Sequence, residues 1–113
     1  MPHVSIEFSE GIEQTHDIQL LCEALFRVLA AQEAFDGPTI KIRATPVKYF
    51  CIGTEPQTFA HATLLLMAGR DQLTRAHLNK TILDVLNKAL PDVGSLTVQE
   101  VEMTLETYAK RVL

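Results

Sequence analysis

The chain presents the same order of secondary-structure elements twice, and this repetition constrains its fold more than any other feature. Alternating or continuous apolar residues predict strands, and apolar residues at three- and four-residue spacing predict helices. In chain order the predicted elements are strand 2–8, helix 17–32, strand 39–45, strand 59–68, helix 72–89 and strand 96–104. His3 and His61 lie 58 positions apart, as do Gly11 and Gly69, and Thr39 and Thr97. We therefore expect a single domain, 1–113, built from pseudo-repeats at about 2–53 and 58–113.

A duplicated strand–helix–strand unit predicts an α+β fold, in which four strands form one sheet and two helices cover the same face. Residues 59–68 are apolar on both sides of the predicted strand, which is typical of a central strand. The face of the sheet without helices then carries apolar side chains that nothing covers. We expect several subunits to associate through this face, because association buries it.

Three local features complete the predicted fold. Pro46 interrupts the second strand, and residues 47–52 are expected to form a short extended or hairpin segment. The apolar phase of the last strand slips between Val98 and Val101, which indicates a β-bulge. Residues 105–113 are expected to form a short helix or an arm.

Composition argues against several classes of function. The net charge of −4 disfavours a nucleic-acid partner, and the apolar run at 62–68 is too short to span a bilayer. No signal peptide is visible, so a cytoplasmic location is expected. The four histidines lack metal-binding spacing, so no metal site is expected. Cys22 and Cys51 belong to no motif, although they can pair in principle.

Pro2 follows the initiator Met1 at the start of the first predicted strand. If Met1 is removed, the ring nitrogen of Pro2 becomes a free secondary amine. An α-amino group titrates at about pH 8, and burial or nearby cations lower its pKa, so that a neutral amine can act as a base at physiological pH. Met-Pro is also a common start of chains in which the proline has no chemical role.

Lys41, Arg43 and Arg70 are the candidate cations, and they favour an anionic substrate. Lys41 and Arg43 share one face of a strand, about 7 Å apart, and Arg70 directly precedes the second helix. Arginines and helix N-termini both bind carboxylates. A neutral amine among cations can move a proton between two carbons of a carbonyl acid without a cofactor. Taken alone, the charge pattern favours a solvated strand face paired with Glu7 and a simple helix-start turn at Arg70.

The segments Met1-Pro2-His3, His61-Ala62-Thr63-Leu64 and Ala68-Gly69-Arg70 resemble the 5-carboxymethyl-2-hydroxymuconate isomerase family. That family belongs to the tautomerase superfamily, with 4-oxalocrotonate tautomerase and macrophage migration inhibitory factor (MIF). The resemblance covers nearly the whole chain. It implies a tautomerase/MIF-like fold, assembly as a homotrimer with sites between subunits, and Pro2 as the general base.

The resemblance also implies roles for the other candidate residues. Arg70 is expected to bind or polarise the substrate, and the second strand to supply another cation. In the isomerases this strand has a pattern that resembles Arg-x-Arg, whereas this chain has Lys41 and Arg43 at the corresponding positions. Because lysine lacks the planar fork of arginine, either Arg43 binds the carboxylate or the substrate differs. Phe50 resembles a residue of the apolar wall in related tautomerases, and a plain edge strand explains it equally well.

We therefore expect a cytoplasmic, homotrimeric isomerase that shifts a proton on a carboxylated 2-hydroxy-diene or 2-oxo-enoate, as in aromatic-compound catabolism. Pro2 is the expected catalytic residue, and the expected substrate-binding residues are Arg70, Arg43, Lys41 and Phe50. A phenylpyruvate-type keto–enol tautomerase is one alternative, which a preference for monoacids over diacids would favour. A non-catalytic, ferredoxin-like binding domain is another, which retention of Met1 would favour.

Overall fold

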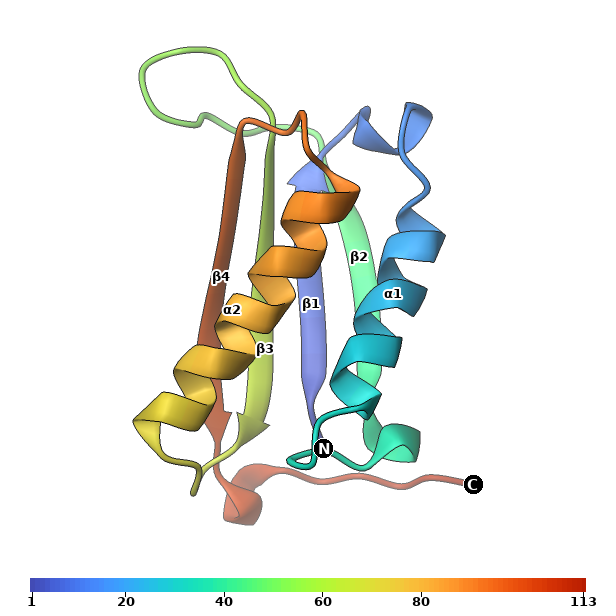
Figure 1. Cartoon of the computed structure of the whole chain (residues 1–113), viewed down its shortest axis with the longest axis vertical. Coiled ribbons are helices and arrows are strands. Elements are labelled where there is room, and N and C mark those ends of the chain that lie inside the picture. Colours follow the sequence, from blue (N-terminus) through green and yellow to red (C-terminus); the bar gives the residue numbers. More distant parts are fainter.

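Two helices cover one face of a four-stranded sheet in the computed structural model, which describes all residues from 1 to 113 (Figure 1). The strands are β1 (His3–Ser9), β2 (Lys41–Val47), β3 (Phe59–Met67) and β4 (Ser95–Met103), and the helices are α1 (Ile18–Ala30) and α2 (Gln72–Ala89). The strand order is β2-β1-β3-β4. The central strands β1 and β3 are antiparallel, and each is parallel to its edge strand. The predicted α+β fold, with both helices on one face, is confirmed.

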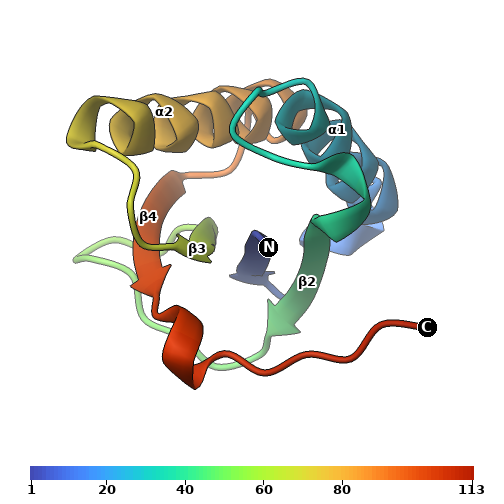
Figure 2. The same ribbon diagram turned by 90° about the horizontal axis from the view of Figure 1, so that it is seen from below.

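The hydrophobic core lies between the helices and the sheet. Alternate residues of each central strand point toward the helices, as the two-residue side-chain period of a strand requires. The buried side chains of the core include Val4, Ile6 and Phe8 from β1, Leu64 and Leu66 from β3, Leu25 and Leu29 from α1, and Leu78, Ile82 and Leu86 from α2. Asp17 and Asp71 begin the helices, because their carboxylates accept hydrogen bonds from Leu20 N (2.9 Å) and Thr74 N (2.7 Å). Neither α1 nor α2 covers the other face of the sheet, called here the open face (Figure 2).

The two halves differ in the number of positions that separate a central strand from its parallel edge strand. Gly11 and Gly69 both follow a central strand and adopt positive φ angles of 110° and 125°, which glycine tolerates best. In the parallel pairs, however, His3 lies opposite Lys41 and His61 lies opposite Thr97. The separation is 38 residues in the first pair (41 − 3) and 36 in the second (97 − 61). The match of Thr39 with Thr97 is therefore not a structural equivalence; Thr97 corresponds to Lys41.

Two predictions about the second strand are wrong. β2 continues through Pro46 to Val47, because an edge strand tolerates proline where the missing N–H would face away from the sheet. Residues 48–58 form neither a strand nor a hairpin but a loop of bends. Phe50 therefore lies on a loop and not on an extended segment.

The predicted bulge in the last strand is also absent. β4 pairs with β3 without interruption from Ser95 to Met103. The apolar phase slips because Glu100 and Glu102 occupy positions that face the helices, where they bind Arg75 of α2 at 3.0 and 2.7 Å. Val101 consequently points to the open face, where it is 43% exposed.

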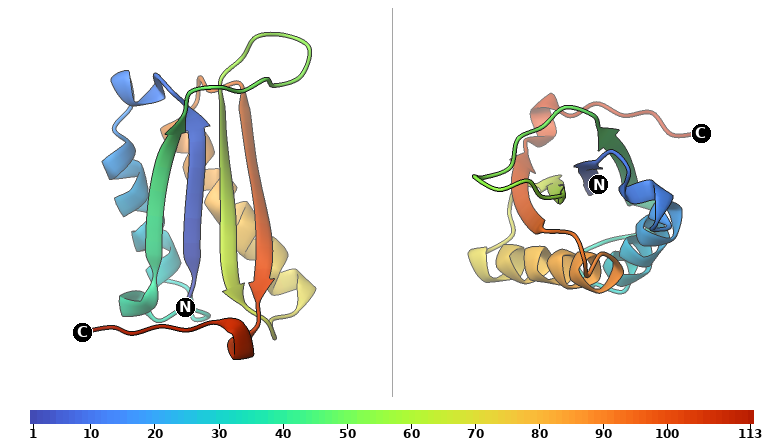
Figure 3. Two further views of the ribbon diagram at one scale, coloured as in Figure 1. Left: turned by 180° about the vertical axis from the view of Figure 1, so that it is seen from behind. Right: turned by 90° about the horizontal axis from the view of Figure 1, so that it is seen from above.

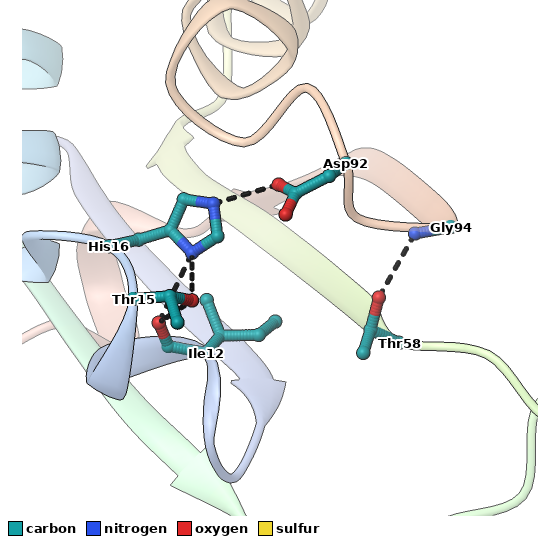
Figure 4. A network of polar contacts seen from close by, with 6 residues as sticks. All are labelled: Ile12, Thr15, His16, Thr58, Asp92 and Gly94. Carbon is teal, nitrogen blue, oxygen red and sulfur yellow. Dashed lines mark hydrogen bonds and ion pairs between the residues drawn. The ribbon is translucent and has the colours of Figure 1, made fainter.

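Polar contacts join the loops at the end of the sheet where β1 finishes (Figure 4). His16 Nε2 binds Asp92 Oδ1 at 2.7 Å, and the other ring nitrogen of His16 contacts Ile12 O at 3.2 Å. Gly94 N donates to Thr58 Oγ1 at 3.1 Å. The first contact fastens the loop after β1 to the connection between α2 and β4, and the last fastens the loop between β2 and β3 to the same connection. They lie at the end of the sheet remote from Pro2.

Candidate active site

Pro2 lies at the end of the sheet where β1 and β2 begin, and the parallel pairing of these strands brings Lys41 to it. The backbone N–H of Lys41 donates to the carbonyl oxygen of Pro2 at 3.1 Å. The Pro2 side chain is less than 2% exposed, and Met1 is half-buried beside it. The C-terminal segment runs past the same end of the sheet (Figure 3). A free amine on Pro2 would therefore lie on a rigid ring that the surrounding side chains hold in place.

The surroundings of the N-terminus favour a neutral amine. Burial lowers the pKa of the Met1 amine below its usual value, because the charged form loses solvation there. The charges of Arg70, Lys41 and Lys110 lower this pKa further, and Asp36 opposes them. The structure thus brings two of the three candidate cations, Arg70 and Lys41, close enough to affect the N-terminal amine.

Lys41 and Arg43 lie on the open face at the start of β2. Lys41 Nζ donates to Thr39 O at 3.0 Å, and Arg43 Nη1 donates to His3 Nδ1 at 3.1 Å. Glu7 forms no ion pair with either cation, so the simple paired-surface interpretation does not hold. The pKa of the neighbouring His3 is lowered from its usual value. Burial is the largest cause, followed by the charges of Arg43, Lys41 and the N-terminus.

Arg70 is held by backbone oxygens rather than by a carboxylate. Its guanidinium donates to Met67 O at 3.1 Å and to Ala34 O at 2.8 Å. The Cζ atom of Arg70 lies 5.2 Å from the centroid of the Phe35 ring, in a cation–π contact. These contacts join the loop after α1 to the turn before α2. Arg70 is therefore more than a helix-start residue: it fastens two loops and places a positive charge near the N-terminus.

Phe50 is remote from Pro2 within one chain. It contacts Phe59, with ring centroids 5.1 Å apart, at the opposite end of the sheet. The seven residues of β1 separate the two ends by about 20 Å. Phe50 can join a site at Pro2 only if another subunit supplies it.

Three residues near Pro2 were not among the sequence-predicted site residues. His3 contacts Arg43, Tyr108 contacts His3 through a 2.8 Å hydrogen bond, and Lys110 Nζ lies 3.2 Å from Met1 Sδ. Strand alternation could have identified His3, because it shares the open face with its neighbours Lys41 and Leu65. Nothing in the local pattern of residues 104–113 indicates that this segment returns to the N-terminus.

The other hollows and clusters lie outside this site. A groove of about 580 Å³ runs between α1 and α2, with Leu20, Val28 and Val85 in its lining, on the helix layer away from the open face. No group of three or more His, Cys, Asp or Glu side chains has a metal-binding arrangement. Cys22 and Cys51 are both free. No helix has the length and apolar character needed to cross a membrane.

A family model identifies the family of this chain, and comparisons with solved structures identify its fold. The family model described as 5-carboxymethyl-2-hydroxymuconate isomerase matches residues 2–111. A 5-carboxymethyl-2-hydroxymuconate delta-isomerase structure shares 19% identity over 99% of this chain and 88% of its own, with a TM-score of 0.86. A 5-carboxymethyl-2-hydroxymuconate isomerase from Deinococcus radiodurans R1 shares 23% identity over 97% of this chain and 88% of its own, with a TM-score of 0.84.

A fused 4-OT protein, solved as a symmetric trimer, has the same fold. It shares 16% identity over 96% of this chain and 93% of its own, with a TM-score of 0.80. At these identities the likeness establishes the tautomerase-type fold alone. No protein with a curated description matches the sequence.

Proposed function

Because the chain belongs to the 5-carboxymethyl-2-hydroxymuconate isomerase family, we propose that it moves a proton on a carboxylated 2-hydroxy-diene or 2-oxo-enoate, with Pro2 as the general base. Isomerase activity of this general type follows from the family itself. The substrate class and the role of Pro2 are the proposal. It requires that Met1 be removed, since only then does Pro2 carry a free amine.

One observation carries the proposal: cations without carboxylate partners gather around the N-terminal amine. Lys41, Arg70 and Lys110 all lower the pKa of that amine, and none of them forms a salt bridge. Cations around a partly buried amine favour an anionic ligand and a neutral base at the same time.

The proposed reaction needs two proton transfers and no cofactor. The neutral ring nitrogen of Pro2 takes a proton from the 2-hydroxyl group or from an acidic carbon of the substrate. The electron pair left behind moves into the conjugated system as a dienolate, whose oxygen charge the cations stabilise. The protonated Pro2 then returns the proton to a carbon at another position of the conjugated system, and the amine becomes neutral again.

The cations divide the work of binding in this proposal. Arg43, exposed on the open face, uses its free donors for a carboxylate while His3 holds it in place. Lys41 supplies a point charge near the reacting oxygen. Arg70, already bound to two carbonyl oxygens, contributes mainly through its charge. Phe50 lines the pocket from a neighbouring subunit in a homotrimer.

A phenylpyruvate-type keto–enol tautomerase is the second candidate function, and the state of Arg70 favours it. A diacid needs two strong carboxylate-binding groups. Two backbone carbonyls and the Phe35 ring already engage Arg70, and Lys41 lacks the bidentate fork. Rates with matched diacid and monoacid substrates distinguish the two functions.

The test compares the wild-type protein with Pro2→Ala. Mass spectrometry first establishes that Met1 is absent from both proteins. We expect Pro2→Ala to reduce kcat by at least about 100-fold, the contribution typical of a general base, while the oligomeric state is kept. A Pro2→Leu variant, which retains Met1, serves as a second control. In this variant Met1 occupies the N-terminus and no free prolyl amine exists. Full turnover of every substrate by Pro2→Ala would refute the mechanism.

A further inference from the structure

We propose that the C-terminal arm, residues 104–113, supplies Lys110 to the Pro2 site of its own chain as a further substrate-binding cation. The proposal rests on the function proposed above, because it assumes that Met1 is removed and that an anion binds beside Pro2. It goes beyond that function by assigning the second carboxylate of a diacid to a residue outside the sheet.

The course of the arm brings it to the site. After β4 the chain forms one short 3₁₀ turn, Leu105–Thr107, and continues without further secondary structure. It runs along the open-face side of the sheet at the end where β1 and β2 begin, close to the N-terminus (Figures 2 and 3). The arm therefore lies beside the proposed base, although 102 residues separate Pro2 from Thr104 in sequence (104 − 2).

His3 and Tyr108 hold the arm in this position. Arg43 can only donate a hydrogen bond, so His3 Nδ1 accepts it and the proton of the neutral ring is on Nε2. His3 Nε2 then donates to the Tyr108 hydroxyl at 2.8 Å. The two rings also meet edge to face, with centroids 5.9 Å apart. One histidine thus orients both a strand cation and the arm.

Lys110 points at the atoms that are lost when Met1 is removed. Its Nζ lies 3.2 Å from Met1 Sδ, and it forms no salt bridge. Removal of Met1 leaves the ammonium group facing the vacated space next to Pro2. The charged groups that act on the Met1 amine are Arg70, Lys41, Lys110 and the single acid Asp36, so the surroundings of the N-terminus are net positive.

This arrangement fits a small dicarboxylate better than a monocarboxylate. Arg43 and Lys110 come from different elements and can each take one carboxylate. Lysine binds as a flexible point charge, so it accepts a range of chain lengths between the two acid groups. Lys110 is thus the residue that we expect to set the preference for diacids.

The test measures binding of adipate and hexanoate, which cannot isomerise, by calorimetry on the protein without Met1. We expect Lys110→Met to weaken adipate binding about fivefold, as loss of one exposed ion pair implies, and hexanoate binding less than twofold. Lys110→Arg should retain adipate binding. Arg111→Met, on the same arm and without an assigned contact, is the matched control and should change neither. Absence of adipate binding by the wild type, or equal binding by Lys110→Met, overturns the proposal.

A second readout does not depend on turnover. Removal of the Lys110 charge should raise the pKa of the Pro2 amine, followed by ¹⁵N NMR, whereas Arg111→Met should leave it unchanged. An unchanged amine pKa in Lys110→Met would contradict the placement of this residue. If adipate binding and the amine pKa respond to Lys110→Met but no substrate turns over, the proposed function fails and the site stands. If Pro2→Ala loses turnover and Lys110→Met changes nothing, the function stands and this site fails.

Discussion

The Nδ1 atom of His3 lies 3.1 Å from the guanidinium of Arg43, and this contact requires a neutral imidazole. A guanidinium has only donors, so a protonated His3 would place two donors and two positive charges against each other. The contact links the residue after the proposed base to a strand cation. It also gives the site a titratable group with a defined response to acid.

The first prediction concerns this response. Burial, followed by the charges of Arg43, Lys41 and the N-terminus, lowers the pKa of His3 below its unfolded value of about 6.5. The folded state therefore binds this proton less readily than the unfolded state. His3 contributes its full share of stability above about pH 6.5 and loses it as pH falls through the folded pKa.

We expect the ¹H NMR titration of His3, assigned with a His3→Asn variant, to have its midpoint below pH 6.5. The difference in unfolding free energy between wild type and His3→Asn should also shrink between pH 7 and pH 5. A midpoint at or above the ordinary histidine value would show that Arg43 does not face this ring in solution.

The second prediction concerns Arg70 as a fastening of two loops. The planar guanidinium of Arg70 donates to Met67 O and Ala34 O from two different nitrogens, whereas lysine has a single ammonium group. Arg70→Lys should therefore lower the free energy of unfolding by about 1–2 kcal/mol. Arg27→Lys is the matched control, since Arg27 is exposed and makes no side-chain hydrogen bond, and it should have little effect. Chemical denaturation measures both. Equal stability of the two variants would mean that Arg70 does not fasten the loops.

The third prediction concerns the ion pairs of Arg75 with Glu100 and Glu102, which explain why charged residues of β4 face the helices. Arg75→Met leaves the half-buried Glu100 without its partner and should lower the free energy of unfolding by about 1–2 kcal/mol. Lys80→Met breaks the exposed pair with Asp84 and should cost less than about 0.5 kcal/mol. Adding Glu100→Leu to Arg75→Met should restore part of the loss, because the unpaired carboxylate is gone. A double variant less stable than Arg75→Met would contradict this account.

Local patterns predict much of this fold because its main elements depend on short-range signals. The helix expected at 72–89 is observed from Gln72 to Ala89, where Asp71 supplies the N-cap. The phase of β4 could not be predicted in this way, because Glu100 faces the core side only through Arg75, a partner 25 residues away. The position of the C-terminal arm could be predicted even less. Tyr108 contacts His3, which lies 105 positions earlier in the sequence, and the residue pattern of the arm does not indicate this contact.

The same distinction applies to the candidate site. Strand alternation placed Lys41 and Arg43 on one face, and the parallel register brings them beside His3 and Ser5. Phe50 was placed by resemblance, and within one chain it lies at the far end of the sheet. A site that requires two subunits cannot be completed from the residues of one chain.

The fourth prediction therefore concerns assembly. The open face carries apolar side chains of β3 and β4, and Val101 lies in its outer part opposite Leu65, 43% exposed. In a homotrimer this face would be buried, so Val101→Lys should shift the mass measured by light scattering from three chains toward one chain of 12.6 kDa. Leu73→Lys changes a residue of α2 that is 83% exposed and should leave the mass unchanged. If Val101→Lys keeps the wild-type mass while Leu73→Lys reduces it, subunits associate through the helix layer and Phe50 cannot reach Pro2 by the route proposed.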